Sequence, residues 1–147
     1  LSSVIHDSIA LFKTRLVDEN LRIAFSNDAD NDLVLINPSE IIQVLLNLLN
    51  NAYDAILLLD DQWIEINLSD DLENVYVDIL DSGDGISEAI SKRIFERFYT
   101  TKSKDKGTGL GLNIAYELIR EHMGTLVYES DSEYTTFSIT LPKVSLN

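Results

Sequence analysis

Two neighbouring stretches of alternating apolar and polar residues constrain the fold more than any other feature of the sequence. Residues 63–68 (WIEINL) and 75–80 (VYVDIL) each predict a β-strand with one buried face, and a polar turn at 69–74 joins them. An Asn-Pro pair at 37–38 opens a long amphipathic run just before them, which predicts a helix over 38–59. This order differs from the regular strand-helix alternation of a doubly wound parallel sheet.

The rest of the chain completes a mixed pattern of helices and strands. Hydrophobic periodicity predicts further helices at 4–17, 87–95 and 110–122, and further strands at 21–26, 126–129 and 136–141. We therefore expect an α+β fold, a two-layer sandwich in which a mixed five-stranded sheet carries three main helices on one face. Without repeats or a linker-like stretch, residues 1–147 are expected to form one domain.

Composition excludes several classes of function. The formal net charge of −14 argues against general nucleic-acid binding, because phosphate backbones would be repelled. The absence of cysteine excludes disulfides and thiolate metal sites, and no apolar run is long enough to span a bilayer. Because the chain starts at Leu1 without an initiator methionine or signal peptide, we expect it to be part of a longer protein.

The positive charges of this acidic chain are concentrated in one segment. Six of the eleven Lys and Arg residues lie within fifteen positions: Lys92, Arg93, Arg97, Lys102, Lys104 and Lys106. This clustering indicates a meeting point for a compact anion, although a solvated basic loop would have the same composition.

A glycine-rich turn follows the basic segment. GTGLGL spans 107–112 and leads directly into the predicted helix 110–122. Its three glycines leave room for a ligand close to the main chain, and the amides at a helix start suit an anion such as phosphate. The alternative is an ordinary loop whose glycines only cap the helix.

A polar stripe runs along the predicted helix 38–59. At helical spacing its polar residues fall within about a quarter to a third of the circumference: Gln43, Asn47, Asn50, Asn51 and Asp54. The opposite side is apolar, formed by Ile41, Leu45, Leu48, Leu49, Ala52, Ala55 and Ile56. Asn47 and Asn51 are one turn apart, so both carboxamides can address one ligand, and their oxygens suit Mg²⁺ or an ordered water. The alternative is a solvent-facing stripe, but asparagine is a mediocre helix former.

The loop DSGDGI at 81–86 directly follows the strand 75–80. A carboxylate at the strand end, Asp81, can accept a hydrogen bond from an amino group such as the exocyclic amine of adenine. The glycines would let the chain pass close to a flat ring, although a plain strand-ending turn would look similar. The spacing lacks the ligand series of a calcium loop.

Four ordered segments together resemble a known family. NLLNNAYDA, DSGDGI, IFERFYTTK and GTGLGL are similar to the N, G1, F and G2 boxes of the catalytic domain of sensor histidine kinases, in the Bergerat ATPase superfamily. The resemblance covers the whole chain. It implies the Bergerat fold, with ATP and Mg²⁺ as cofactors held between the helices and a lid.

The resemblance also implies roles for individual residues. Asn51 corresponds to the Mg²⁺ ligand and Asn47 to its phosphate-side companion, so both are the expected metal residues, and Asn47 and Lys102 are the expected catalytic ones. Phe95 and Phe98 match aromatic residues that anchor the lid. The expected nucleotide-binding residues are Asn47, Asn50, Asn51, Asp54, Asp81, Gly83, Gly85, Ile86, Phe98, Thr100, Thr101, Lys102, Gly107, Thr108, Gly109, Leu110, Gly111 and Leu112.

One departure from the common family pattern points to a branch of it. Many of these kinases carry Lys-Tyr after the N-box alanine, whereas this chain continues with Tyr53-Asp54-Ala55. With the short lid at 99–112 (YTTKSKDKGTGLGL), this is similar to the nitrogen-regulator branch. The phosphate contact expected of that lysine would then come from Lys102 or Lys104.

The N-box position that activates water in related ATPases is occupied here by asparagine. Hydrolytic ATPases of the superfamily usually have glutamate where this chain has Asn47, and a carboxamide has no useful basicity near neutral pH. Asp54 is a candidate substitute, about two turns along the helix. We expect negligible ATPase activity, with catalysis by positioning and charge neutralisation.

The phosphate acceptor is expected to lie outside this chain. His6 and His122 are its only histidines, and neither lies in the His-Glu or His-Asp motif that marks the acceptor helix of the family. His6 is followed by Asp7 but falls in the segment matching the first helix of the catalytic domain. His122, near Gly124 at a helix end, is expected to be a charge partner for the helix dipole.

The implied partners are a histidine-bearing dimerisation domain of the same parent protein and, indirectly, a response regulator. We expect no nucleic-acid partner and no direct membrane contact, and we expect the isolated domain to be a monomer. Its expected location is the cytoplasm, either as part of a soluble protein or as the cytoplasmic part of a membrane sensor. Two alternatives remain open: an anti-sigma-type serine kinase that switches a partner protein, and a non-catalytic nucleotide sensor.

Overall fold

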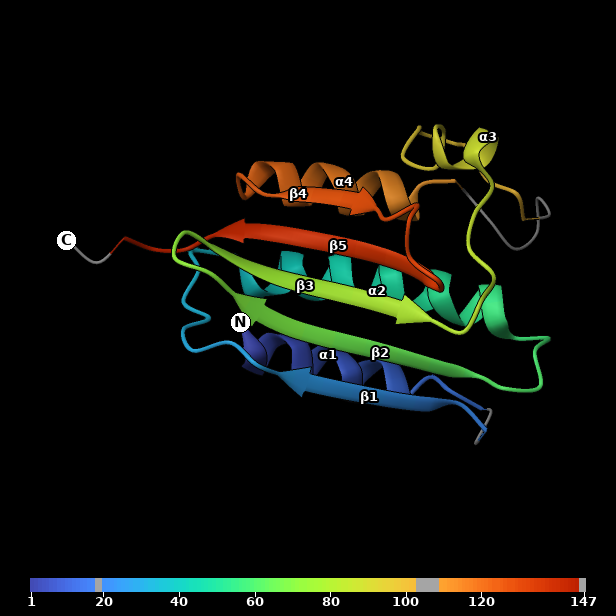
Figure 1. The fold of residues 1–147 in the computed structure, drawn as a ribbon, viewed down its shortest axis with the longest axis horizontal. Coiled ribbons are helices and arrows are strands. Elements are labelled where there is room, and N and C mark those ends of the chain that lie inside the picture. The colour runs from blue at the N-terminus through green and yellow to red at the C-terminus, as the bar shows by residue number, and fades with distance from the viewer. Residues whose placement is uncertain (18–19, 103–108, 146–147) are drawn as a thin grey trace.

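A five-stranded sheet forms one layer of the molecule (Figure 1). The computed structural model describes residues 1–17, 20–102 and 109–145. The strands lie in the order β1-β2-β3-β5-β4. Their bounds are β1 Arg22–Asn27, β2 Trp63–Asp70, β3 Asn74–Asp81, β4 Thr125–Tyr128 and β5 Thr135–Pro142.

The pairing of the strands follows from their connections. β1 and β2 are parallel, which requires a crossover, and α2 (Pro38–Ile56) provides it. The pairs β2–β3, β3–β5 and β5–β4 are antiparallel. The predicted α+β fold with a mixed sheet is therefore confirmed.

Three helices form the second layer on one face of the sheet: α1 (Ser2–Lys13), α2 and α4 (Gly111–Glu121). α2 lies in the middle and packs against both α1 and α4. A fourth, short helix, α3 (Glu88–Ser91), lies beyond the end of β3. None of the helices in the described part of the chain is long and apolar enough to cross a bilayer.

The core lies between the helices and the inward faces of the strands. β2 and β3 alternate as predicted, because every second side chain of a strand points to the same face. The buried strand residues include Ile64, Ile66, Leu68, Val75, Val77 and Ile79. They meet the apolar side of α2, where all the residues predicted for that side are buried except Ala55, which is exposed. Ala55 was predicted to lie on the side opposite the polar stripe, but it lines a cavity together with residues of the stripe, as described below.

The element ends differ slightly from the sequence predictions. α2 begins at Pro38, and the Asn37 side chain caps it by accepting a hydrogen bond from the Ser39 N–H at 3.1 Å. It ends at Ile56, three residues before the predicted end. The predicted helix 87–95 is shorter still, since only α3 is helical and hydrogen-bonded turns follow it.

His122 lies at the end of α4, as predicted, and also contacts the start of α2. Its Nδ1–H donates to the Leu118 carbonyl at 2.7 Å, and its Nε2 accepts from the Asn37 N–H at 3.0 Å. The Glu40 carboxylate at the start of α2 lies 3.5 Å from the same Nε2. The ring therefore links the end of α4 to the start of α2 by hydrogen bonds.

Met123 adopts a left-handed backbone where α4 ends, with φ of +58°. This conformation costs a residue with a Cβ about 1–2 kcal/mol, and glycine is the usual occupant. Met123 is 80% exposed, so its side chain contributes little packing. We expect Met123→Gly to raise the free energy of unfolding by about 0.5–1 kcal/mol, since the greater freedom of glycine in the unfolded chain offsets part of the gain. Urea denaturation with Met123→Ala as the control tests this: an alanine variant as stable as the glycine variant would contradict it.

Candidate functional site

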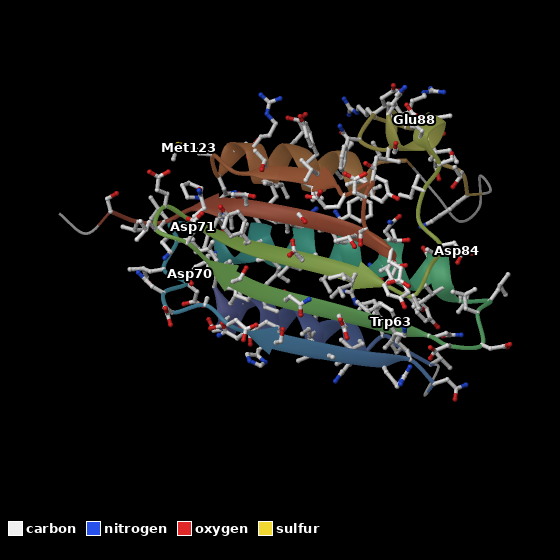
Figure 2. All side chains as sticks on the ribbon, in the orientation of Figure 1. Trp63, Asp70, Asp71, Asp84, Glu88 and Met123 are labelled. Carbon is white, nitrogen blue, oxygen red and sulfur yellow. The ribbon has the colours of Figure 1, made fainter. Side chains whose placement is uncertain are left out.

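A cavity of about 570 Å³ lies between α2, the loop after β3, the lid residues before α4 and the start of α4. Figure 2 labels Asp84 on the loop that leaves β3, at the opposite end of the sheet from Asp70, Asp71 and Met123. Segments far apart in sequence therefore meet at one end of the molecule.

Most of the residues predicted to bind nucleotide line this one cavity. They are Asn47, Asn50, Asn51, Asp54, Gly83, Gly85, Ile86, Thr100, Thr101, Lys102, Gly109, Gly111 and Leu112. Asp81, Phe98 and Leu110 are described but do not line it. The predictions for Gly107 and Thr108, and for Lys104, fall outside the residues that the structure describes.

Asp81 lies directly behind the cavity wall. Its side chain is only 2% exposed, and its Oδ1 accepts a hydrogen bond from the Gly83 N–H at 2.8 Å. Burial raises the pKa of Asp81 to about 6, although hydrogen bonds from Gly83 and the Thr135 hydroxyl act in the opposite direction. A carboxyl group that sits between protonation states near neutral pH is typical of a functional site.

Thr135 is a wall residue that the sequence reasoning missed. It lines the cavity, and its hydroxyl bonds to Asp81 while accepting from the Gly85 N–H at 3.0 Å. β5 pairs with β3 so that Thr135 is the direct partner of Asp81. Only the strand register brings them together, and the sequence around Thr135 gives no separate signal. The other wall residues not predicted are Ala55, Asp84, Ser87, Ile90, Ile94 and Tyr99.

The two asparagines of the polar stripe reach the same cavity from successive turns of α2. The Nδ2 of Asn47 donates to the Gly111 carbonyl at 3.1 Å, which ties α2 to the start of α4. This bond uses the donor end of the carboxamide and leaves its oxygen as an acceptor. Asn51 is half-buried, and its side chain has no hydrogen-bond partner among the described residues.

Lys102 pairs with Asp54 across the cavity mouth. Its Nζ lies 2.5 Å from the Asp54 Oδ2, and both side chains are partly exposed. The main-chain N–H of Lys102 donates to the Thr100 hydroxyl. Lys102, which was expected to contact phosphate, therefore contacts Asp54, which was considered as a substitute for the missing catalytic base.

The two lid aromatics have different environments. Phe95 stacks on Tyr116 of α4 with ring centroids 5.1 Å apart, as an anchor would. Phe98 is 66% exposed, so it does not anchor the lid in this structure. Its backbone is left-handed, with φ of +67°, and its N–H donates to the Gly109 carbonyl at 2.8 Å.

Gly109 is needed where the lid returns to α4. A Cβ at this position would lie 2.2 Å from the carbonyl carbon of Phe98, and the φ of Gly109 is +69°. The backbone of Phe98 fills the space that the missing side chain leaves. This glycine therefore allows two chain segments to approach each other, and it also lines the cavity.

The oxygen atoms on the cavity wall suit a hard cation that takes its other ligands from phosphate. Among the described residues, no group of three or more His, Cys, Asp or Glu side chains could hold a metal ion by itself. Mg²⁺ commonly takes one or two protein oxygens and completes its shell with phosphates and water. The carboxamide oxygens of Asn47 and Asn51 fit that pattern.

The fold and the cavity define a class: an α+β sandwich whose helical layer holds a polar, phosphate-compatible site at one end. The family described as histidine kinase-, DNA gyrase B-, and HSP90-like ATPase matches residues 36–145. The chain belongs to this family, which confirms the resemblance inferred from the four motifs at the level of the family.

Relatives and solved structures agree with this assignment. Sporulation kinase A of Bacillus subtilis (strain 168) is 33% identical over 144 residues, which is 97% of this chain and 23% of that protein. The chain thus spans about a quarter of that relative. The nucleotide-free catalytic domain of histidine kinase ThkA superposes with a TM-score of 0.83 at 33% identity, covering 98% of this chain and 95% of that one. A second ThkA structure, in complex with response regulator protein TrrA, has a TM-score of 0.79 at 28% identity, covering 98% and 40%.

Proposed function

We propose that residues 1–147 are one domain, the catalytic ATP-binding domain of a sensor histidine kinase. It would present the γ-phosphate of ATP to a histidine on a separate dimerisation domain of the same parent protein. The observation that carries this proposal is the single cavity that unites four sequence motifs while offering Asn47 where a hydrolytic ATPase needs an acidic base.

The adenine ring is assigned to the end of the cavity formed by the loop 81–86. Asp81 supplies a buried carboxyl group behind that wall, Thr135 supplies a hydroxyl group on it, and Ile86 supplies an apolar surface. A buried carboxylate can accept a hydrogen bond from the exocyclic amine, while apolar side chains contact the faces of the ring.

The phosphates are assigned to the end of the cavity near the start of α4. The first amides of a helix have no partner within the helix, and they favour anions. Asn51 and Asn47 would hold Mg²⁺ through their oxygens, and the ion would neutralise charge on the phosphates. Lys102 would exchange Asp54 for a phosphate oxygen when nucleotide is present.

The chemistry requires an acceptor from outside the cavity. An imidazole nitrogen attacks the γ-phosphorus with its lone pair, a P–N bond forms, and the bond to the β–γ bridging oxygen breaks to release ADP. The histidines of this chain do not line the cavity. His6 packs edge-on against Phe25 of β1, and His122 is held at the end of α4. These positions support an acceptor on a separate domain.

The wider setting follows from the relatives. The sequence Tyr53-Asp54-Ala55 and the short lid support the nitrogen-regulator branch. The ThkA complex contains a response regulator, so we assign a response regulator as the indirect partner. We assign the domain to the cytoplasm or the cytoplasmic part of a membrane sensor, as a monomer without direct membrane contact.

Phosphoryl transfer to the histidine domain of the parent protein tests the proposal. The chain is mixed with that domain, Mg²⁺ and γ-labelled ATP, and the label is followed on both proteins. We expect acid-labile, alkali-stable phosphate on the added domain and none on this chain. Acid-stable phosphoserine on a partner would favour the serine kinase, and tight nucleotide binding without transfer would favour the sensor. Rapid release of free phosphate by the chain alone would overturn the assignment of Asn47.

A further inference from the structure

The hydroxyl of Tyr128 forms hydrogen bonds with both the N–H and the carbonyl group of Ile86. Tyr128 is the last residue of the edge strand β4, and its hydroxyl accepts a hydrogen bond from the Ile86 N–H at 2.8 Å. The same hydroxyl donates to the Ile86 carbonyl at a longer distance of 3.4 Å.

Three amides of the loop 81–86 are satisfied by side chains. The Gly83 N–H donates to Asp81, the Gly85 N–H to Thr135, and the Ile86 N–H to Tyr128. The first two acceptors lie on the central strands β3 and β5. Tyr128 supplies the third acceptor from the edge strand β4. It holds the loop at Ile86, and the cavity lining continues from there to Ile90 of α3.

The approach of the loop to this hydroxyl depends on Gly85. A Cβ at Gly85 would lie 3.0 Å from the Tyr128 hydroxyl oxygen, and the φ of Gly85 is +89°, a conformation that favours glycine. The ring of Tyr128 packs against Phe137, with centroids 5.7 Å apart. The hydroxyl therefore has a defined position before the loop meets it.

We propose that Tyr128 is a positioning residue for the base-binding end of the site. It acts through Ile86, which lines the cavity, whereas Tyr128 itself does not. By holding both backbone groups of Ile86, it keeps the apolar wall of the adenine site in place before nucleotide arrives, which lowers the ordering cost of binding. This inference rests on the proposed function, since it assumes that the base binds at this loop.

The substitution Tyr128→Phe tests it, because phenylalanine keeps the ring on Phe137 and removes only the hydroxyl. One hydrogen bond corresponds to about a three- to tenfold change in an equilibrium constant. We expect the amide of Ile86 to exchange with solvent faster by that factor, and a non-hydrolysable ATP analogue with Mg²⁺ to bind about three- to tenfold more weakly. Tyr76→Phe is the matched control. It removes a hydroxyl that donates to Asp71 at 2.6 Å, at the far end of the sheet.

A double-mutant cycle separates positioning from general destabilisation. Because Tyr128 acts through Ile86, Tyr128→Phe should weaken binding less in an Ile86→Ala background than in the wild type. Fully additive penalties in the free energy of binding, unchanged Ile86 exchange, or an equal loss in Tyr76→Phe would each overturn the proposal while leaving the proposed function intact. A wild-type chain that fails to bind the ATP analogue would overturn the proposed function and this inference with it.

Discussion

Replacing Asn51 with alanine is expected to slow phosphoryl transfer by about 100- to 1,000-fold, the usual effect of removing one group that stabilises the transferring charge. Asn51 lines the cavity from α2, and its carboxamide has no hydrogen-bond partner in the described part of the chain. Its oxygen is therefore available to hold Mg²⁺, which would supply positive charge next to the phosphates of the nucleotide. Substitution by alanine keeps the helix, because alanine is the best helix former.

The measurement is the initial rate of transfer to the histidine domain at saturating Mg-ATP. Gln43→Ala is the control, since Gln43 belongs to the same polar stripe but is exposed and does not line the cavity. We expect it to transfer phosphate at the wild-type rate. Binding of nucleotide without Mg²⁺ should be similar in all three proteins. A rate for Asn51→Ala within a few-fold of wild type would remove Asn51 from the metal site.

The second large effect is expected at Asp81, where Asp81→Asn should weaken nucleotide binding by about 30- to 100-fold. A hydrogen bond to a charged group contributes about 1.5–3 kcal/mol. Asparagine has only one side-chain oxygen, so its NH₂ group would face one of the donors that the carboxylate of Asp81 accepts from. Calorimetric titration with a non-hydrolysable ATP analogue and Mg²⁺ measures the loss. Asp84→Asn, an exposed cavity residue of the same loop, should bind nearly as the wild type does. Equal binding by Asp81→Asn and the wild type would move the adenine site elsewhere.

The same substitution should change how stability depends on pH. The pKa of Asp81 is about 6 in the folded protein, compared with the ordinary value of 3.8, so the folded state binds more protons than the unfolded state between these values. Its contribution to stability is therefore fully present below about pH 4 and is lost as the pH rises to about 6. At about 1.4 kcal/mol per pKa unit, the loss is about 3 kcal/mol. Urea denaturation across this range should show that the decline is absent in Asp81→Asn.

The parts of the site that could be predicted are those encoded in contiguous sequence. The polar stripe of α2 and the loop after β3 were placed correctly on their elements, because helical and strand periodicity fix which side chains share a face. Their meeting at one cavity followed from the family resemblance, since periodicity alone does not say which elements are neighbours in space.

The parts that could not be predicted depend on tertiary contacts. Thr135 reaches Asp81, and Tyr128 reaches Ile86, only because β5 and β4 pair in one particular register. A shift of one residue would turn each side chain to the other face. Phe98 and Lys102 were assigned roles from their positions in the motifs. The exposure of Phe98 and the ion pair between Lys102 and Asp54 depend instead on how the chain folds around them.

The hydrogen bond between Phe98 and Gly109 has a consequence for how the lid can vary. It joins the two ends of the segment between them at a fixed separation, as the stem of a hairpin joins the ends of its loop. The entropy of closing such a loop grows slowly with its length, by about 0.6 kcal/mol for each doubling. Lids of quite different length and composition could therefore be exchanged between these two residues without changing the register of α4 against α2. The lid can thus change in sequence during evolution while the rest of the domain stays the same.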